Sequence, residues 1–136
     1  MVISSKGRYA LRVMVDLAEH GGDGYVSMRD VARRQELSDK YAGQVMSLLS
    51  RAGLVSGVTG KGGGYRLTRK PEEYPLGEIL RLTEGSLAPV ACLEEGAHPC
   101  DRAAQCRTLP VWNRLWQIMG DYLDSVTLRD LLKTDE

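Results

Sequence analysis

The sequence has no apolar run that approaches the roughly 20 residues of a membrane-spanning helix. Its opening, MVISSKGRYA, lacks the basic and then apolar plan of a signal peptide. We therefore expect a cytoplasmic protein with no membrane partner. No nucleophile with a neighbouring base and no pair of acidic catalytic groups stands out, so the sequence implies neither an enzyme nor a small-molecule substrate. Its 136 residues suffice for one compact domain or a small domain with an appended helix.

Cysteine is scarce, and all of it lies in one segment. The three cysteines are Cys92, Cys100 and Cys106, spaced C-x7-C-x5-C. An odd number of cysteines in a reducing compartment argues against a disulfide framework and for metal binding or redox chemistry. Thiolates gathered in a loop are soft ligands that hold iron–sulfur clusters or zinc.

Net charge is also lacking, because 18 basic residues balance 18 acidic ones. The charges are nevertheless segregated. Residues 1–75 hold 12 basic and 8 acidic residues, and residues 76–136 hold 6 and 10. Between positions 24 and 70, 9 basic residues face only 3 acidic ones. Such asymmetry indicates a polyanion partner for the first half, although an ordinary solvated surface is the alternative.

The first half reads as three helices. Apolar positions of helical spacing predict a helix from Ser5 to Glu19, capped by Ser4 or Ser5. An S-x-x-D capping box starts a second at Ser27, after a short strand at residues 25–26. A third helix runs from Ser38 to about residue 52. Two short helices joined by a tight turn are typical of a helix-turn-helix, and an ordinary helical hairpin with a polar face is the alternative.

A β-hairpin is predicted directly after the third helix. Residues 54–59 and 65–68 alternate like strands around the turn GKGGG. Basic residues surround this turn: Lys61, Arg66, Arg69 and Lys70. A nucleotide-binding phosphate loop is the competing interpretation, but the G-x-x-x-x-G-K-[ST] spacing is absent. The predicted DNA-binding residues are Ser38, Lys40, Tyr41, Gln44, Ser47 and Arg51 on the helix, and Thr59, Lys61, Gly62 and Gly63 on the wing.

The fold class is therefore mainly α with a small β-hairpin wing, a winged helix-turn-helix over residues 1–75. Residues 76–136 form a second part, with a short helix at 76–84, the cysteine loop at 86–108 and a helix from Pro110 to Asp124. The apolar face of that last helix is wider than one small domain covers, which predicts a homodimer; burial within one chain is the alternative. Thr127 and Asp130 form a capping box for a short final helix.

Four features together resemble the Rrf2 family of bacterial winged-helix regulators: SSKGRYALRVMVDLA, GLVSGVTGKGGGYRL, PLGEILRLTEG, and a three-cysteine loop before a Trp-containing helix. The resemblance implies a dimeric transcription regulator that binds a double-stranded DNA operator. It also implies that Cys92, Cys100 and Cys106 ligate an iron–sulfur cluster, with [2Fe–2S] favoured and [4Fe–4S] as the alternative. DNA binding would then respond to cluster status, redox state or nitric oxide.

The sequence departs from the family pattern in four places. Leu109 stands where the cluster-binding branch has a histidine, and Arg8 where some nitric-oxide sensors have an acidic residue. Gly43 replaces a glutamate that reads the operator, and Thr59 replaces a wing arginine. The fourth cluster ligand is therefore open. His98, the only histidine in the loop, is the favoured candidate, and a solvated loop histidine is the alternative. The other candidates are a group of a partner chain and the nearby carboxylates of Glu94, Glu95 and Asp101.

Two other functions stay open. Three cysteines and His98 suit a Cys3His zinc site, so a thiol- or zinc-based redox-responsive DNA-binding regulator is one alternative. A cluster carrier that does not bind DNA is the other, but it leaves the basic segment and the wing unexplained.

Overall fold

The computed structural model describes residues 3–94 and 101–132. Its main elements are α1 (Ser5–His20), α2 (Met28–Gln35), α3 (Asp39–Arg51), β1 (Val55–Val58), β2 (Gly64–Leu67), α4 (Leu76–Glu84) and α5 (Leu109–Ser125). Three 3-10 turns complete it: η1 (Pro71–Glu73), η2 (Ala91–Leu93) and η3 (Leu128–Leu131). None of the helices in these two ranges is long and apolar enough to cross a membrane.

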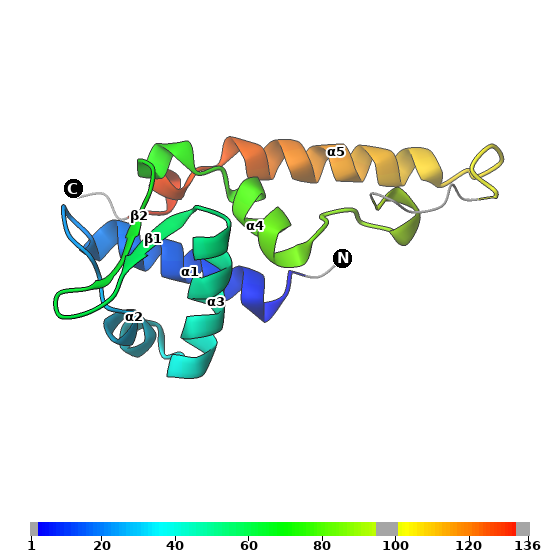
Figure 1. Cartoon of the computed structure of the whole chain (residues 1–136). Coiled ribbons are helices and arrows are strands. Elements are labelled where there is room, and N and C mark those ends of the chain that lie inside the picture. Colours follow the sequence, from blue (N-terminus) through cyan, green and yellow to red (C-terminus); the bar gives the residue numbers. More distant parts are fainter. Residues whose placement is uncertain (1–2, 95–100, 133–136) are drawn as a thin grey trace.

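The predicted winged helix is confirmed. Figure 1 shows α1 through the middle of the molecule, α2 and α3 on one side of it, and the β1–β2 hairpin beside them. α5 runs along the other side, and its N-terminal end extends beyond the other helices, next to the segments of the cysteine loop (Figure 1). The α1 helix contacts α2, α3, α4 and η3, so it forms the centre of the packing.

Serine caps fix where the first three helices start. The hydroxyls of Ser4, Ser27 and Ser38 each accept a hydrogen bond from the backbone amide three residues later. Each bond satisfies an amide that has no partner inside the helix. Glu36, in the left-handed conformation with φ of 57°, ends α2 and makes the tight turn into α3. The predicted starts of these helices are therefore confirmed, with Ser4 rather than Ser5 as the first cap.

One hydrophobic core joins both halves of the chain. Buried residues of α1 and α3, among them Met14 and Leu49, share a cluster with Tyr74, Ile79 and Leu128. The chain returns to this core after α5, because the Leu128 amide donates to the Tyr74 carbonyl (2.9 Å). The predicted final helix is a 3-10 turn, and its Thr127–Asp130 capping box is confirmed.

The hairpin pairs β1 with β2 in antiparallel register, from Val55 opposite Leu67 to Val58 opposite Gly64. The strand predicted at residues 25–26 is reduced to a single bridge, in which Val26 and Tyr65 exchange two backbone hydrogen bonds of 2.8 Å. At Gly64 (φ 148°) a Cβ would overlap the Val26 backbone. Glycine is therefore needed where this bridge ties the wing to the segment before α2.

Candidate nucleic-acid interface and cysteine loop

The α3 helix presents one row of polar side chains to solvent. Lys40, Gln44, Ser47 and Arg51 are all exposed, and their spacing places them on one helical face. The opposite face, with Ala42, Val45, Met46 and Leu49, is buried in the core. Ser38 is exposed at the start of the row. The structure therefore brings five of the six predicted residues of this helix together on an open surface.

Tyr41, the sixth, is half-buried beside the row. Its ring meets the Tyr9 ring edge to face, with centroids 5.6 Å apart. The Arg12 guanidinium lies 4.9 Å from the centroid of the same Tyr9 ring. Tyr41 therefore anchors α3 to α1 as well as bordering the predicted DNA-binding face.

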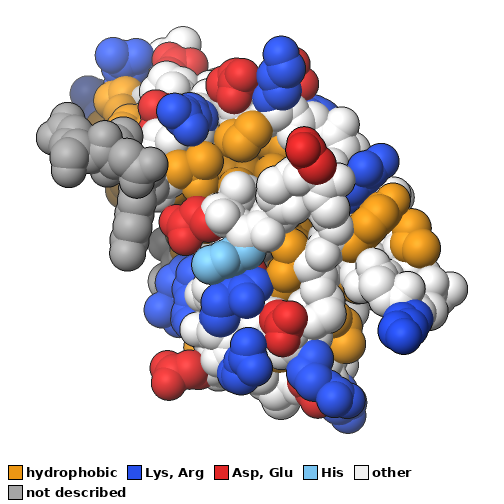
Figure 2. Space-filling model, turned by 90° about the vertical axis from the view of Figure 1, so that its left-hand side faces the viewer, with side chains coloured by type: hydrophobic (Ala, Val, Ile, Leu, Met, Phe, Trp, Pro, Cys, Tyr) orange, Lys and Arg blue, Asp and Glu red, His pale blue; other side chains and the backbone are white. Residues whose placement is uncertain are grey.

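The predicted wing residues lie at the hairpin tip. Thr59, Lys61 and Gly62 are exposed, and Gly63 is half-buried. A hollow of about 380 Å³ lies between the wing and the helices α2 and α3. Its lining includes Met28 of α2 and Ser50 of α3. The wing and the α3 row therefore flank a hollow on one side of the molecule. Figure 2 shows the wing end of the protein, where Lys and Arg side chains gather below the pale-blue histidine with fewer acidic ones among them.

Two arginines of the basic segment are paired with carboxylates of the fold. Arg34 donates to Asp16 through both Nε (2.9 Å) and Nη2 (2.7 Å), and the Asp16 side chain is fully buried. Arg69 does not surround the wing tip, as the sequence suggested, but lies at the wing base in an ion pair with Glu78. Arg66 stacks at 4.9 Å over the Tyr25 ring. Of the basic residues assigned to the wing, Lys61 is the one at the exposed tip.

Tyr74 organises the base of the wing. Its ring is fully buried, and its hydroxyl donates to the Leu54 carbonyl (2.8 Å). The same oxygen accepts from the amides of Thr68 and Arg69, each at 2.9 Å. The sequence analysis missed this residue, because a tyrosine between charged and proline residues carries no periodic signal. One side chain therefore joins both ends of the hairpin.

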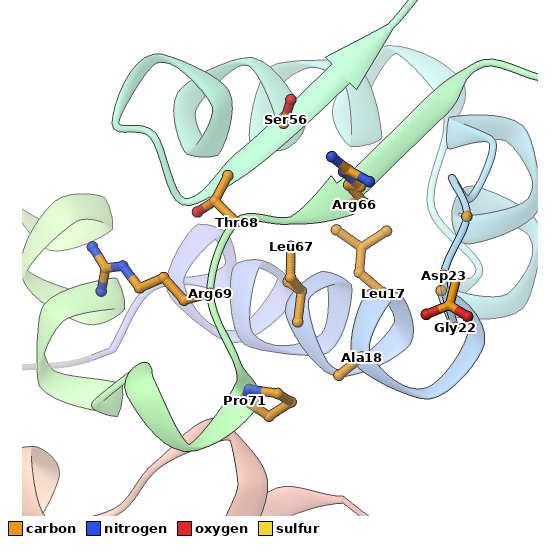
Figure 3. A pocket seen from close by; sticks show the side chains of 12 residues that line it. Leu17, Ala18, Gly22, Asp23, Ser56, Arg66, Leu67, Thr68, Arg69 and Pro71 are labelled. Carbon is orange, nitrogen blue, oxygen red and sulfur yellow. The ribbon is translucent and has the colours of Figure 1, made fainter.

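The Arg69 side chain continues this connection to α4. Its guanidinium lies 5.2 Å from the centroid of the Tyr74 ring and binds Glu78 of α4 through two hydrogen bonds of 2.6 and 3.0 Å. These hydrogen bonds lower the pKa of Glu78. Arg66 and Arg69 both line a cleft of about 540 Å³ between α1 and the wing, and Figure 3 shows their side chains pointing in different directions.

A second ion pair holds the other side of α4. Arg81 binds Asp124 of α5 through two hydrogen bonds of 2.7 and 3.1 Å. The Leu76 amide, at the start of α4, also donates to the Val126 carbonyl beyond α5 (2.9 Å). The α4 helix is thus tied to the wing by Glu78 and to α5 by Arg81.

The α5 helix keeps no residue buried within this chain. Val111, Ile118 and Tyr122 are 57%, 48% and 64% exposed. The alternative that the whole apolar face is covered within one chain is therefore wrong. An exposed apolar face of this kind is typical of a protein–protein contact.

Two of the three cysteines lie in the described residues. Cys92 is exposed in η2, and Cys106 is half-buried three residues before α5. The Cys106 Sγ lies 3.4 Å from the Thr108 hydroxyl. Hydrogen bonds from that hydroxyl and from the backbone amides of Thr108 and Leu109 lower the pKa of the Cys106 thiol. The thiolate is the form of cysteine that binds metals and reacts with oxidants, so Cys106 is well suited to act as a metal ligand.

Cys100 and His98 lie outside the described residues, so their predicted roles stay predictions. Among the residues that are described, no three His, Cys, Asp or Glu side chains converge as a metal site. The thiols that the structure describes are those of Cys92 and Cys106, which are both free and lie on either side of residues 95–100. Soft thiolates match the ligands of iron–sulfur clusters and zinc.

Known proteins are similar to this chain in sequence and in fold. Residues 3–134 match the Rrf2 family, described as an iron-dependent transcriptional regulator. The chain is 37% identical, over all of its length and 80% of the relative, to the HTH-type transcriptional regulator IscR of Aliivibrio salmonicida (strain LFI1238). It is 38% identical to the structure of CymR, the global cysteine regulator of B. subtilis, with 99% of both chains covered and a TM-score of 0.79.

The structure of T. potens IscR is also similar, at 35% identity and a TM-score of 0.73 over 96% of this chain and 85% of that one. These relatives are named as regulators and not as enzymes, in agreement with the absence of catalytic groups expected from the sequence. This chain therefore belongs to the Rrf2 family of transcription regulators.

Proposed function

We propose that this protein is a homodimeric DNA-binding regulator that senses iron–sulfur cluster status, redox state or nitric oxide through Cys92, Cys100 and Cys106. The observation that carries the proposal is the place of Cys106. It stands directly before α5, the helix with the exposed apolar face, and that helix is joined through α4 to the base of the wing. Cys106 therefore lies at the end of the predicted sensing loop, where the loop meets α5 and through it the rest of the molecule.

DNA binding is assigned to the α3 row and the wing tip. In a dimer, two copies of α3 enter successive major grooves, as in other helix-turn-helix proteins. Gln44 reads adenine through its amide, while Ser38, Lys40, Ser47 and Arg51 contact phosphates or base edges. The wing residues Thr59, Lys61, Gly62 and Gly63 lie against the adjacent backbone or minor groove. The exposure of the α3 row and of Thr59, Lys61 and Gly62, together with the family match, supports this assignment.

The dimer is assigned to α5. Its exposed side chains Val111, Leu115, Trp116, Ile118 and Tyr122 offer an apolar surface to a second copy. Because a two-fold interface uses the same patch on both subunits, one helix face suffices to build it.

The cofactor assigned to the loop is an iron–sulfur cluster, preferably [2Fe–2S]. Relatives named IscR and the family description as iron-dependent support it. Bound to thiolates, such a cluster supplies a centre whose charge and stability respond to oxidants and to iron supply. Cys92, Cys100 and Cys106 would hold it, and His98 or a group of the second copy would complete the ligands, since Leu109 carries no donor.

Anaerobic purification tests the cofactor assignment. The expected product is a brown protein with visible absorption and nearly equal amounts of iron and sulfide per chain. The Cys106→Ser variant should lose most of the colour, whereas His98→Ala loses it only where His98 is the fourth ligand. A colourless, zinc-containing protein would contradict the cluster.

A second candidate is thiol- or zinc-based regulation without a cluster. The similarity to CymR, named a global cysteine regulator, and the lowered pKa of the Cys106 thiol favour it. A DNA affinity that changes on mild oxidation of the iron-free protein, and that is restored by a reducing thiol, supports this candidate over the cluster.

A further inference from the structure

A notch of about 190 Å³ lies between the first turn of α1 and the side of α3. Its lining consists of Lys6, Tyr41, Gln44, Val45, Leu48 and Arg51. Gln44 and Arg51 also belong to the exposed row of α3. Lys6 comes from a different helix and was not among the residues predicted to contact DNA.

The notch flanks the DNA-facing row of α3 on the side away from the wing. At roughly 100° per residue, Lys40, Gln44, Ser47 and Arg51 form the centre of the exposed face. Ser50 lies beside this face toward the wing hollow, whereas Leu48 lies on the other side toward Lys6. The row therefore runs between two concave surfaces.

Three contacts fix the first turn of α1, which carries Lys6. The Ser4 hydroxyl caps the helix at the Gly7 amide, and the Ser4 amide and hydroxyl donate to the Glu84 carboxylate at 3.0 and 2.7 Å. Gly7 is buried so closely against α4 that a Cβ would overlap the Glu84 carboxylate and press against the Thr83 hydroxyl. The backbone of Lys6 is therefore held firmly beside α3.

The charges that line the notch are unbalanced. Lys6 and Arg51 are both exposed, and neither forms an ion pair with any residue that the structure describes. Arg51 donates only to the Ser47 carbonyl of its own helix, at 3.4 Å. Arg34, Arg69 and Arg81, by contrast, are each bound by a carboxylate. Two cations and the Gln44 amide that share one notch form a site for an anion.

We propose that this notch binds one phosphate of the DNA backbone, held jointly by Lys6 and Arg51, beside the major groove that α3 enters. The proposal rests on the proposed DNA-binding function and adds α1 to the interface. With the wing on one side of α3 and Lys6 on the other, backbone contacts bracket the base-reading row. Such contacts fix the register of the helix in the groove without reading sequence.

The test is the affinity of the full-length protein for fluorescent DNA duplexes, measured by anisotropy at several salt concentrations. Lys6→Gln should weaken binding about fivefold near 0.15 M salt. The fall of log K with log salt should also become shallower, by about one unit of slope. The loss should be equal for unrelated duplexes, and Lys6→Arg should restore most of it. Arg129→Gln is the matched control, because it removes one exposed charge from η3. The proposal would be overturned if Lys6→Gln had the same affinity and the same salt dependence as the control Arg129→Gln.

The double variant Lys6→Gln, Arg51→Gln shows whether one phosphate is shared. A shared phosphate predicts a combined loss smaller than the product of the two single losses. A combined loss of affinity equal to the product of the two single losses, with a salt dependence shallower by about two units of slope, would show two separate phosphates. That result would contradict the shared site. Wild-type protein without affinity for any duplex would contradict the proposed function itself, a result distinct from failure of the notch. Unchanged thermal unfolding of Lys6→Gln separates both outcomes from misfolding.

Discussion

Arg69 and Glu78 form a two-pronged ion pair, with Nη1–Oε2 at 2.6 Å and Nη2–Oε1 at 3.0 Å, that joins the end of the wing to α4. The Arg69 amide and the Thr68 amide both donate to the Tyr74 hydroxyl beside this pair. The position of the wing is therefore set by α4 as well as by the strands. Because Arg81 on α4 also holds Asp124, a displacement of α5 has a continuous path of contacts to the wing.

Glu78→Gln should loosen the wing base without unfolding the protein. The pair is partly exposed, with 35% and 42% of the two side chains accessible, so its loss should cost less than about 1 kcal/mol of stability. Hydrogen exchange of the Thr68 and Arg69 amides should accelerate, and DNA affinity should fall slightly. Asp30→Asn, which breaks an exposed ion pair with Arg33, is the control. Unchanged exchange in Glu78→Gln would show that the strands and Tyr74 position the wing without this ion pair.

Tyr74→Phe should destabilise the whole fold. The substitution keeps the ring but leaves the amides of Thr68 and Arg69 without their acceptor, whereas the Leu54 carbonyl keeps the Thr68 hydroxyl as a donor at 3.3 Å. Burial of such unsatisfied groups costs about 1–3 kcal/mol, measurable by urea denaturation. Tyr122→Phe is the control: it removes a hydroxyl from a side chain that is 64% exposed, and it should hardly change the urea midpoint. Equal midpoints for the two variants would contradict the role of Tyr74.

Acid should weaken the fold partly through Asp16. Burial alone would raise the pKa of this carboxyl, but hydrogen bonds from Arg34 and Gln35 outweigh it and lower the pKa below the usual value of 3.8. The folded state therefore binds the proton less tightly than the unfolded state. This contribution to stability is complete above pH ~5 and is lost as the pH falls below the ordinary carboxyl pKa of about 4.

Asp16→Asn removes that titration. The variant should be less stable than wild type at neutral pH by about 1–3 kcal/mol, since Arg34 loses its partner but keeps partial access to water. Its free energy of unfolding should also fall less steeply between pH 5 and 3. Asp30→Asn, at an exposed ion pair, provides the comparison. Parallel pH profiles for Asp16→Asn and wild type would exclude Asp16 as a source of the acid sensitivity.

Ile118→Glu should convert the protein to monomers. A carboxylate in the middle of the exposed apolar face of α5 would be buried without a partner in a dimer, but would stay solvated in the single chain. Light scattering after size-exclusion chromatography measures the mass. Asn113→Glu adds the same charge at an exposed polar position of the helix. A wild-type protein that is monomeric at micromolar concentration would refute the interface.

The sequence was sufficient to predict most of the fold, because its signals are local. Ser4, Ser27 and Ser38 start helices through contacts only three residues long, and the bounds of α4 were predicted from its short apolar pattern. The same holds for the α3 row, since exposure along one helix follows from its periodicity.

Charge pairing could not be predicted in the same way. Arg69 counted as a wing cation in the sequence, yet it is bound to Glu78 at the wing base. Lys6 gave no signal, because its notch forms only when α1 and α3 pack together. Which basic residues are free for DNA depends on tertiary contacts, and no spacing along the chain encodes them.

The most direct test of the proposed regulator is its DNA affinity with and without the cluster. Anaerobically purified protein is titrated with an operator duplex, selected from random sequences with the same protein, before and after removal of iron, alongside Cys106→Ser. Wild type should change affinity more than about fivefold between the two forms, the usual lower range of coupling between two sites, while Cys106→Ser should show one affinity throughout. Equal affinities for both forms of the wild type would contradict cluster sensing.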